Sequence, residues 1–187
     1  MPLAVALLLI PGQHSSKAWL FDAAGVALVA AGEWIRLWAV RHIGGISRTR
    51  SDRLGPLVAT GPFAHVRNPL YIGNMALWVG FALSAHLPWL AVLIAVVIGV
   101  EYHAIARWEE QLLVSRRGDE YQAYMARVPR WMPATKSRAR RDREGIAIAQ
   151  AAAHPVPFSW RETFYSERGT LIAIAAGYLL LWVKNRL

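Results

Sequence analysis

The chain alternates between long apolar runs and short segments that carry most of its charge. Crossing the hydrocarbon core of a bilayer takes about 20 apolar residues, so the run from Ala18 to Val40 predicts a transmembrane helix. The opening run, 1–12, is shorter, and we expect it to be a retained partial span rather than a signal peptide. The last run, from Gly169 to Val183, predicts a short transmembrane helix, with a helix in the membrane interface as the alternative.

Two further runs, 70–85 and 89–106, are separated by only a few residues that end at Pro88. This connection is too short for anything except a tight helical hairpin, so the segments before and after it lie on the same side of the membrane. The first helix of the hairpin should begin at Asn68-Pro69. Asn is a favoured N-cap because its side-chain oxygen accepts a free backbone N–H, and Pro in the next position loses nothing by lacking one.

Small and charged residues in the first span predict its contacts. Ala23, Ala27 and Ala31 are four residues apart, which would let a neighbouring helix approach closely along that stripe. Glu33 and Arg36 lie three residues apart on one helical face, near the end of the span, and predict an ion pair at the membrane interface.

The second helix of the hairpin should continue beyond its apolar run, through Glu109-Glu110, until Gly118 offers a C-cap. A short helix then opens at Asp119 and ends at Val128-Pro129. The spacing of its apolar side chains predicts a face that packs back on the membrane domain, made by Tyr121, Tyr124 and Met125.

Composition indicates a membrane protein. Of 187 residues, 55% are hydrophobic, and the chain contains nine Trp. The formal net charge of +9 comes from basic residues between the apolar runs, as the positive-inside rule expects, so no nucleic-acid partner is predicted. The arginine-rich loop from Arg41 to Arg53 places its side of the membrane in the cytoplasm. The absence of cysteine excludes disulfides and thiolate chemistry.

We therefore predict an all-α fold, a polytopic transmembrane helical bundle of about four or five membrane helices with a catalytic loop region at the cytoplasmic face. Residues 1–187 form a single membrane domain, and its catalytic core is placed at 57–133 because polar signatures flank the hairpin there. The segment 134–168, charge-dense and then alanine-rich, is interpreted as a basic linker near anionic headgroups, and 169–187 as a C-terminal hydrophobic helix.

Motifs of familiar soluble chemistries are absent. The chain has no GxGxxG, GxxxxGK[ST], HExxH or GxSxG, and its six His are scattered without ligand spacing, so no metal site is predicted.

Three motifs in a fixed order carry a resemblance. GPFAHVRNPLYIG begins at Gly61, the glutamate pair is Glu109-Glu110, and GDEYQAYMARVPRWMP begins at Gly118, with the hairpin between the first two. Over about 57–133 the chain resembles the isoprenylcysteine carboxyl methyltransferase and phospholipid methyltransferase family of integral membrane enzymes. The resemblance implies S-adenosylmethionine as methyl donor, bound at the cytoplasmic face between the loop and the glutamates, and a lipid acceptor that enters sideways from the bilayer.

The resemblance and the chemistry of the donor together assign the cofactor-binding residues. The sulfonium cation suits the aromatic faces of Phe63 and Tyr71, and the ammonium can pair with Glu109. The donor's carboxylate suits Arg67 or the backbone N–H groups at the helix start. The full set is Leu57, Val58, Phe63, Arg67, Asn68, Pro69, Tyr71 and Glu109.

Two departures from the family pattern concern the acceptor. Asn68 replaces a His, and Ile105 stands where the carboxyl methyltransferases have a substrate-contacting Arg. Arg107 or His103 could compensate, yet methylation of a prenylcysteine carboxylate is expected to be poor. If the acceptor is an amine or a phenol it must lose a proton, for which Glu110, His65 and His103 are candidate bases. The candidate catalytic residues are Asn68, Tyr71, His103, Arg107 and Glu110.

The sequence thus predicts an S-adenosylmethionine-dependent methyltransferase acting on a membrane-embedded lipid amine, hydroxyl or isoprenylcysteine-type carboxylate. Its partners would be this lipophilic acceptor and membrane lipids, and we expect an integral protein of a prokaryotic plasma membrane. Two alternatives stay open: a membrane NADPH-dependent reductase of the steroid 5-alpha-reductase type, and a non-catalytic membrane adaptor.

Overall fold

The computed structural model describes residues 2–12, 18–44, 57–133 and 158–185, and in these ranges it is all-helical, without strands. The arginine-rich loop after residue 44 and the basic stretch after residue 133 lie outside the described residues. The helices are α1 (Pro2–Leu9), α2 (Ala18–Ile43), α3 (Pro69–Ser84), α4 (Pro88–Arg117), α5 (Asp119–Arg127) and α7 (Trp160–Lys184), with a 3₁₀ turn, η2, at Gly61–Ala64.

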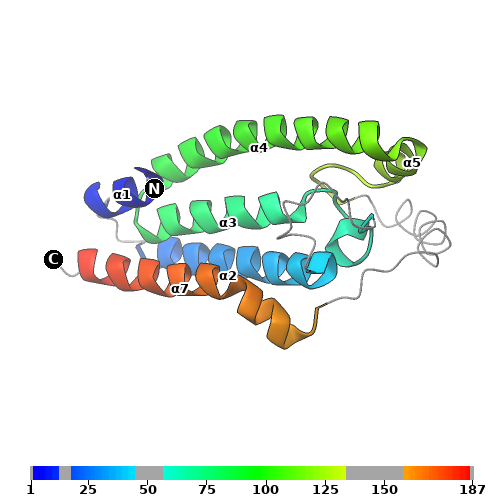
Figure 1. Cartoon of the computed structure of the whole chain (residues 1–187). Coiled ribbons are helices and arrows are strands. Elements are labelled where there is room, and N and C mark those ends of the chain that lie inside the picture. Colours follow the sequence, from blue (N-terminus) through cyan, green and yellow to red (C-terminus); the bar gives the residue numbers. More distant parts are fainter. Residues whose placement is uncertain (1, 13–17, 45–56, 134–157, 186–187) are drawn as a thin grey trace.

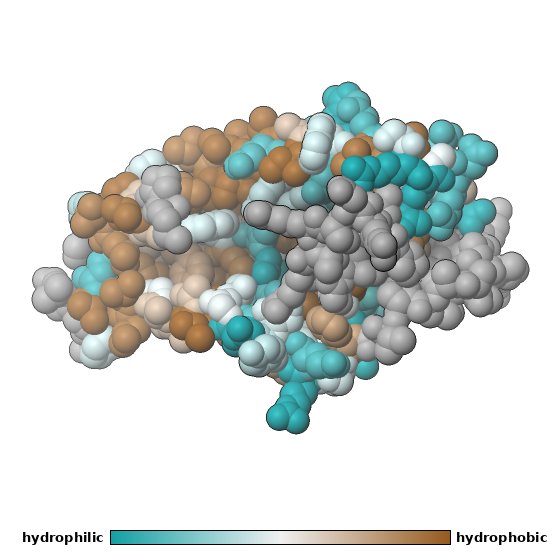
Figure 2. Space-filling view, in the orientation of Figure 1, coloured by the Kyte–Doolittle hydropathy of each residue, from teal (hydrophilic) through white to brown (hydrophobic). Residues whose placement is uncertain are grey.

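Four long helices lie roughly side by side, with α3 between α4 and α2, and α7 along α2 (Figure 1). The short helix α1 and both chain termini lie at one end of this bundle, while α5 and η2 lie at the other (Figure 1). The two ends differ in polarity: the surface over α1 and the neighbouring half of α4 is hydrophobic, and hydrophilic residues gather at the α5 end (Figure 2). The bundle therefore has an apolar body and one polar end.

Two helices in the described ranges are long and apolar enough to cross a membrane, α2 and α4. Only 28% of the apolar window of α4 is buried inside the protein, which leaves a row of large apolar side chains uncovered. Helix α3 has 16 residues and rises only about 24 Å, less than the hydrocarbon core of about 30 Å. Two candidate spans are shown, and the expected four or five are not confirmed. The exposed side chains of α4 include Val92, Leu93, Val96, Val97 and Val100.

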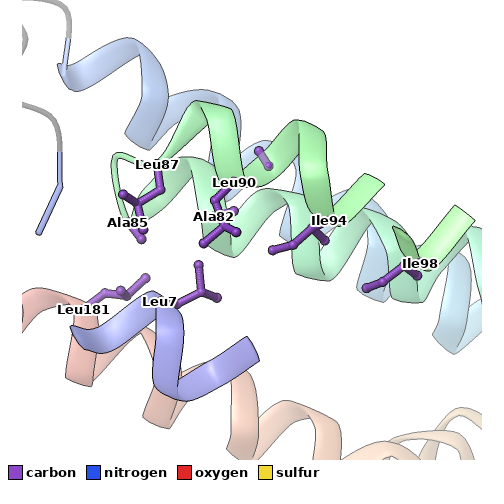
Figure 3. Close-up of a cluster of buried hydrophobic side chains, with 9 residues drawn as sticks. Leu7, Ala82, Ala85, Leu87, Leu90, Ile94, Ile98 and Leu181 are labelled. Carbon is purple, nitrogen blue, oxygen red and sulfur yellow. The ribbon is translucent and has the colours of Figure 1, made fainter. Parts of the chain in front are cut away.

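The tight hairpin is confirmed. Helix α3 ends at Ser84 and α4 begins at Pro88, and the turn between them holds His86 at a φ of 58°. A core cluster surrounds this turn, where Leu7 of α1 and Leu181 of α7 meet the hairpin's side chains (Figure 3). Because the hairpin closes at this end, the N-terminus of α3 and the C-terminal half of α4 are brought together at the polar end.

The predicted alanine stripe is wrong. Ala23, Ala27 and Ala31 are exposed, and α2 instead packs on α3 through Gly25 and Gly32, which are buried. A Cβ added at Gly32 would lie 2.7 Å from the carbonyl oxygen of Gly73 on α3, so glycine is required for this close approach. The spacing of small residues correctly identified α2 as a helix with a close neighbour, but it indicated the wrong face. Small residues, both Ala and Gly, recur on more than one face of this helix.

Helix α7 begins earlier than the apolar run at its centre. It starts at Trp160, inside the segment interpreted as a linker, so the boundary at 168 is wrong. A capping box causes this start: the Ser159 hydroxyl accepts the backbone N–H of Glu162, and the Glu162 carboxylate accepts the backbone N–H of Ser159. The first turn packs on α2, where Trp160 stacks on Trp34 with ring centroids 5.9 Å apart.

The extension of α4 is confirmed. The helix runs without a break to Arg117, and Gly118 ends it at a φ of 56°. Helix α5 follows at Asp119, and Tyr121 and Tyr124 are buried, as the spacing predicted. They pack with Ala59 and Leu57 of the loop before α3, so α5 covers this loop.

Candidate functional site

Tyr71 and Glu109 meet where the two arms of the hairpin open at the polar end. Tyr71 lies in the first turn of α3, and its hydroxyl donates a hydrogen bond of 2.9 Å to Oε2 of Glu109 on α4. The ring of Tyr71 stacks on Tyr102 of α4, with centroids 4.7 Å apart and planes at 25°. Glu109 is half-buried, and it has no cationic partner in the described part of the chain.

Glu110, the next residue, has a different environment. Its carboxylate is buried and accepts two hydrogen bonds from Arg130, 3.0 Å from Nε and 2.7 Å from Nη2. Nη1 of Arg67 lies 3.3 Å from the Oε1 atom of Glu110. These hydrogen bonds raise the pKa of Arg130. Both oxygens of the Glu110 carboxylate are already engaged by guanidinium groups, so the geometry disfavours Glu110 as the general base.

Arg67 is half-buried at the end of the loop that leads into α3. Its backbone N–H donates to the carbonyl of Pro129 at 2.9 Å, which joins the loop to the segment after α5. Its side chain contacts Glu110, yet Nε and Nη1 of Arg67 have no hydrogen-bond acceptor in the described residues. Buried guanidinium N–H groups without acceptors are costly, and they mark a place where an anionic group would be stabilised.

Asn68 precedes the first residue of α3, as predicted, but it does not cap the helix with its side chain. Its ψ of 57° is outside the extended range that an N-cap adopts, and its side-chain nitrogen instead lies 3.5 Å from the carbonyl oxygen of Arg130. Pro69 follows as the first residue of α3 and is fully buried. Asn68 therefore joins the loop to the segment after α5.

The remaining loop residues are fixed by α5. The Tyr124 hydroxyl donates to the backbone carbonyl of Phe63 at 2.8 Å, and the Phe63 ring is itself buried. Leu57 packs against the same tyrosines, and Val58 beside it is half-buried. Burial raises the pKa of Tyr124, and burial followed by the charge of Glu110 raises that of Tyr121 to about 12. Both hydroxyls thus stay protonated at neutral pH, and that of Tyr124 is the donor to Phe63.

The other candidates lie apart from the Tyr71–Glu109 pair. His103 and Arg107 are exposed on α4, and Nδ1 of His103 accepts a hydrogen bond of 3.3 Å from the Trp131 indole. Ile105 is half-buried between them. His65 lies beside Trp38, with ring centroids 6.0 Å apart. The structure brings Tyr71 together with Glu109, and Arg67 with Glu110, but no described contact joins His103 or Arg107 to either pair.

Sequence reasoning missed three site residues. Arg130 completes the Glu110 ion pair, Tyr102 stacks on Tyr71, and Arg36 bonds α2 to α3 and α7. Arg130 could have been found as a basic residue directly after the helix-ending Val128-Pro129, and Tyr102 from its place two turns before Glu109 on the same helix.

A cavity of about 620 Å³ lies in the bundle beneath the site, in the recess between α4 and α7 (Figure 2). Its walls come from α1, α2, α3, α4 and α7 and are mostly apolar. Tyr102 lines it and stacks on Tyr71, the partner of Glu109, so the cavity adjoins the Tyr71–Glu109 pair. No group of three or more His, Asp or Glu side chains within the described ranges could hold a metal ion.

Comparison with known proteins gives relatives that match part of the chain. The chain is similar to the nickel-cobalt-cadmium resistance protein NccN of Alcaligenes xylosoxydans xylosoxydans, at 34% identity, and to the cobalt-zinc-cadmium resistance protein CzcN of Cupriavidus metallidurans, at 28%. Each match extends over 109 residues, which is 58% of this chain and 46% of the relative. The chain thus spans about half the length of the curated relatives it matches. No solved structure matches it.

A family comparison covers the helices that build the site. The profile of the phospholipid methyltransferase family matches residues 20–119, more than half of the chain, and includes Arg67, Tyr71 and both glutamates. The resemblance seen in the motifs is confirmed: this protein belongs to the phospholipid methyltransferase family of membrane methyltransferases.

Proposed function

We propose that this protein transfers a methyl group from S-adenosylmethionine to a lipid-like acceptor embedded in the membrane. The observation that carries the proposal is the pairing state of the two glutamates. Glu110 is neutralised by Arg67 and Arg130, whereas the half-buried Glu109 has no cationic partner in the described residues. A half-buried carboxylate is stabilised by a cation, and the donor's ammonium is one.

The residues fit the other groups of the donor as well. Arg67 has two buried N–H-bearing atoms without acceptors, which suit the donor's carboxylate. The face of Tyr71 that Tyr102 leaves uncovered suits a sulfonium. The donor supplies a methyl group activated by a positively charged sulfur. The protein's own contribution is to hold donor and acceptor in line and to keep water out, so no covalent nucleophile is needed.

For the acceptor we favour a lipid amine or hydroxyl over an isoprenylcysteine-type carboxylate. Ile105 provides no charge where the carboxyl methyltransferases have an Arg, and the nearest alternatives, His103 and Arg107, point to the exposed side of α4. The apolar cavity beneath Tyr102 offers room for the acceptor's chain. We place the protein in a prokaryotic plasma membrane as a bundle of four or five membrane helices, with the site at the cytoplasmic face.

The names of the two relatives concern resistance to nickel, cobalt, zinc and cadmium. That role is a property of the relatives, and we propose no metal binding for this chain.

Calorimetry on purified protein in detergent tests the proposal. S-adenosylmethionine should bind and NADPH should not, which separates the methyltransferase from the reductase and adaptor alternatives. A charge-assisted hydrogen bond is worth roughly 1.5 to 3 kcal/mol, so Glu109→Gln should weaken donor binding about ten- to a hundredfold. Glu101→Gln, an exposed glutamate on the same helix, is the matched control and should bind as the parent does.

Two outcomes would contradict the proposal: equal donor affinity in Glu109→Gln and the parent, or binding of NADPH in place of S-adenosylmethionine. The acceptor is then identified by incubating lipid extracts with protein and methyl-labelled donor and resolving the labelled product by mass.

A further inference from the structure

The last turn of α2 contacts the start of the donor loop, by which we mean residues 60–67, where η2 and two of the assigned donor-binding residues lie. Helix α2 and η2 pack together at the polar end of the bundle (Figure 1). At this contact, Nδ1 of the half-buried His42 shares a hydrogen bond of 3.0 Å with the hydroxyl oxygen of Thr60. His42 belongs to none of the three motifs that carry the family resemblance.

Thr60 uses its hydroxyl for this distant contact rather than for a local one. It is the N-cap residue of η2, and its carbonyl oxygen accepts the backbone N–H of Phe63 at 3.1 Å. A threonine at an N-cap commonly also accepts a free backbone N–H with its side chain, but the side chain of Thr60 does not. The hydroxyl therefore fixes the donor loop to α2 instead of stabilising η2.

Gly61 allows the imidazole of His42 to lie directly against the backbone of the loop. Its φ is 57°, and a Cβ there would lie 2.4 Å from Cδ2 and 2.5 Å from Nε2 of His42. A side chain at this position would displace the ring. Trp38, one turn earlier on α2, meets the same ring edge-on, with centroids 6.4 Å apart and planes at 75°. The ring of His42 is thus oriented by two contacts besides its hydrogen bond.

The rest of the donor loop is held from another direction, by the segment that follows α4. The Phe63 carbonyl accepts the hydroxyl of Tyr124 on α5, and the Arg67 backbone N–H donates to the carbonyl of Pro129. Neither of these hydrogen bonds involves α2. If the contact with His42 were lost, the start of the loop could move about its attachment to α5, and its side chains would be less precisely placed.

We propose that His42 is a positioning residue for the methyl donor, which fixes through Thr60 and Gly61 the loop that presents Phe63 and Arg67 to that donor. The inference rests on the proposed function, because the donor is what these two side chains would contact. In this role His42 contacts neither donor nor acceptor. Its effect on donor affinity is therefore exerted through the loop alone.

Calorimetry with S-adenosylmethionine tests the link on purified protein in detergent. Thr60→Val removes the hydroxyl with little change of shape and should weaken donor binding about three- to tenfold, as the loss of one hydrogen bond gives. Thr60→Ser keeps the hydroxyl and should bind as the parent does. His42→Ala should lose at least as much as Thr60→Val, and the double variant His42→Ala/Thr60→Val should lose no more than His42→Ala alone.

His86 provides the matched control. It is also half-buried, and its Nε2 lies 3.0 Å from Oδ1 of Asp22 at the opposite end of the bundle. His86→Asn removes this contact with a residue that tolerates the positive φ of this position. This variant should bind the donor as the parent does.

Hydrogen exchange of the ligand-free protein provides a second measurement that needs no donor. The amides of Phe63, His65 and Val66 donate to carbonyls within the donor loop, and they should exchange about three- to tenfold faster in Thr60→Val and His42→Ala. The amide of Val128, which donates to the carbonyl of Tyr124, should be unchanged. If the parent does not bind S-adenosylmethionine, the proposed function fails, and exchange alone still decides whether His42 fixes the loop.

The proposal is overturned if Thr60→Val and His42→Ala bind the donor as the parent does and only their unfolding temperature falls, because His42 would then be merely structural. Additive losses in the double variant also overturn it, as does a loss in Thr60→Ser or His86→Asn as large as that in Thr60→Val. Unchanged exchange of the loop amides overturns it as well. If His42→Ala fails to fold, the two Thr60 variants decide by the same measurements.

Discussion

The carboxylate of Glu110 holds Arg130 through two hydrogen bonds, 3.0 Å from Nε and 2.7 Å from Nη2. Consecutive residues on a helix point about 100° apart, so Glu110 faces the segment after α5 while Glu109 faces α3. One glutamate is therefore part of the frame that positions the loop before α3, and the other is left for a ligand. This division explains how two adjacent carboxylates of α4 can both be withdrawn from solvent, one buried and one half-buried.

The first prediction concerns this frame. Glu110→Gln leaves Arg67 and Arg130 without their carboxylate, and breaking a buried ion pair costs roughly 3 to 5 kcal/mol. Because Arg130 is partly exposed, the lower end of that range is expected, with a fall of several degrees in the unfolding temperature in detergent. The double variant Glu110→Gln/Arg130→Gln should lose less than the sum of the two single variants. Additive losses would show that the two side chains do not interact.

A second prediction separates the two contributions of Tyr71. Tyr71→Phe keeps the stack on Tyr102 and loses only the hydrogen bond to Glu109, so it should retain most of the donor affinity. Tyr71→Ala removes the aromatic face and should lose clearly more. Calorimetry with S-adenosylmethionine measures both, with Tyr165→Phe, an exposed tyrosine of α7, as the control. An equal loss in the two variants, which both lack the hydroxyl, would assign the role to the hydroxyl instead.

Much of the fold could be predicted because it depends on local signals. Pro88 fixes the hairpin by its position between two apolar runs, Gly118 ends α4 through a positive φ, and the tyrosines of α5 follow helical spacing. The Ser159 capping box was equally local but lay in a segment dominated by charge and alanine, so the start of α7 was placed too late.

The site was harder to predict because its geometry depends on contacts between distant segments. The motif order placed Tyr71 and Glu109 together, and the structure brings them within hydrogen-bonding distance. Glu110, rather than Glu109, is the buried glutamate because it pairs with Arg130. The position of Arg130 depends on how α5 docks, and the spacing of residues on α4 does not predict it. The side chain of Asn68 could not be placed from the sequence for the same reason. Asn is a favoured N-cap, but its side-chain nitrogen here donates to the Arg130 carbonyl, in a segment distant in the sequence.

A third prediction concerns Arg36, which the sequence indicated only as the partner of Glu33. It also bonds Asn74, Glu167 and Thr170, so Arg36→Met removes one of the polar links between α7 and the other helices and leaves two buried carboxylates unneutralised. We expect a large loss of thermal stability, partly restored by the second change Glu167→Gln because it removes one of those charges. No restoration in the double variant would show that the Glu167 charge is not what destabilises Arg36→Met.

The last prediction tests the contact between α2 and α3. A Cβ at Gly32 would lie 2.7 Å from the Gly73 carbonyl oxygen and 3.0 Å from the Cβ of Ala76, and the first is backbone that cannot move without separating the helices. Gly32→Ala should therefore lower the unfolding temperature, even though alanine favours the helical conformation by about 1 kcal/mol. Gly99→Ala on α4, where a Cβ meets nothing within 4 Å, is the matched control and should be neutral or slightly stabilising. Equal behaviour of the two variants in thermal unfolding would mean that α2 and α3 have room to adjust, and that Gly32 is not required at their contact.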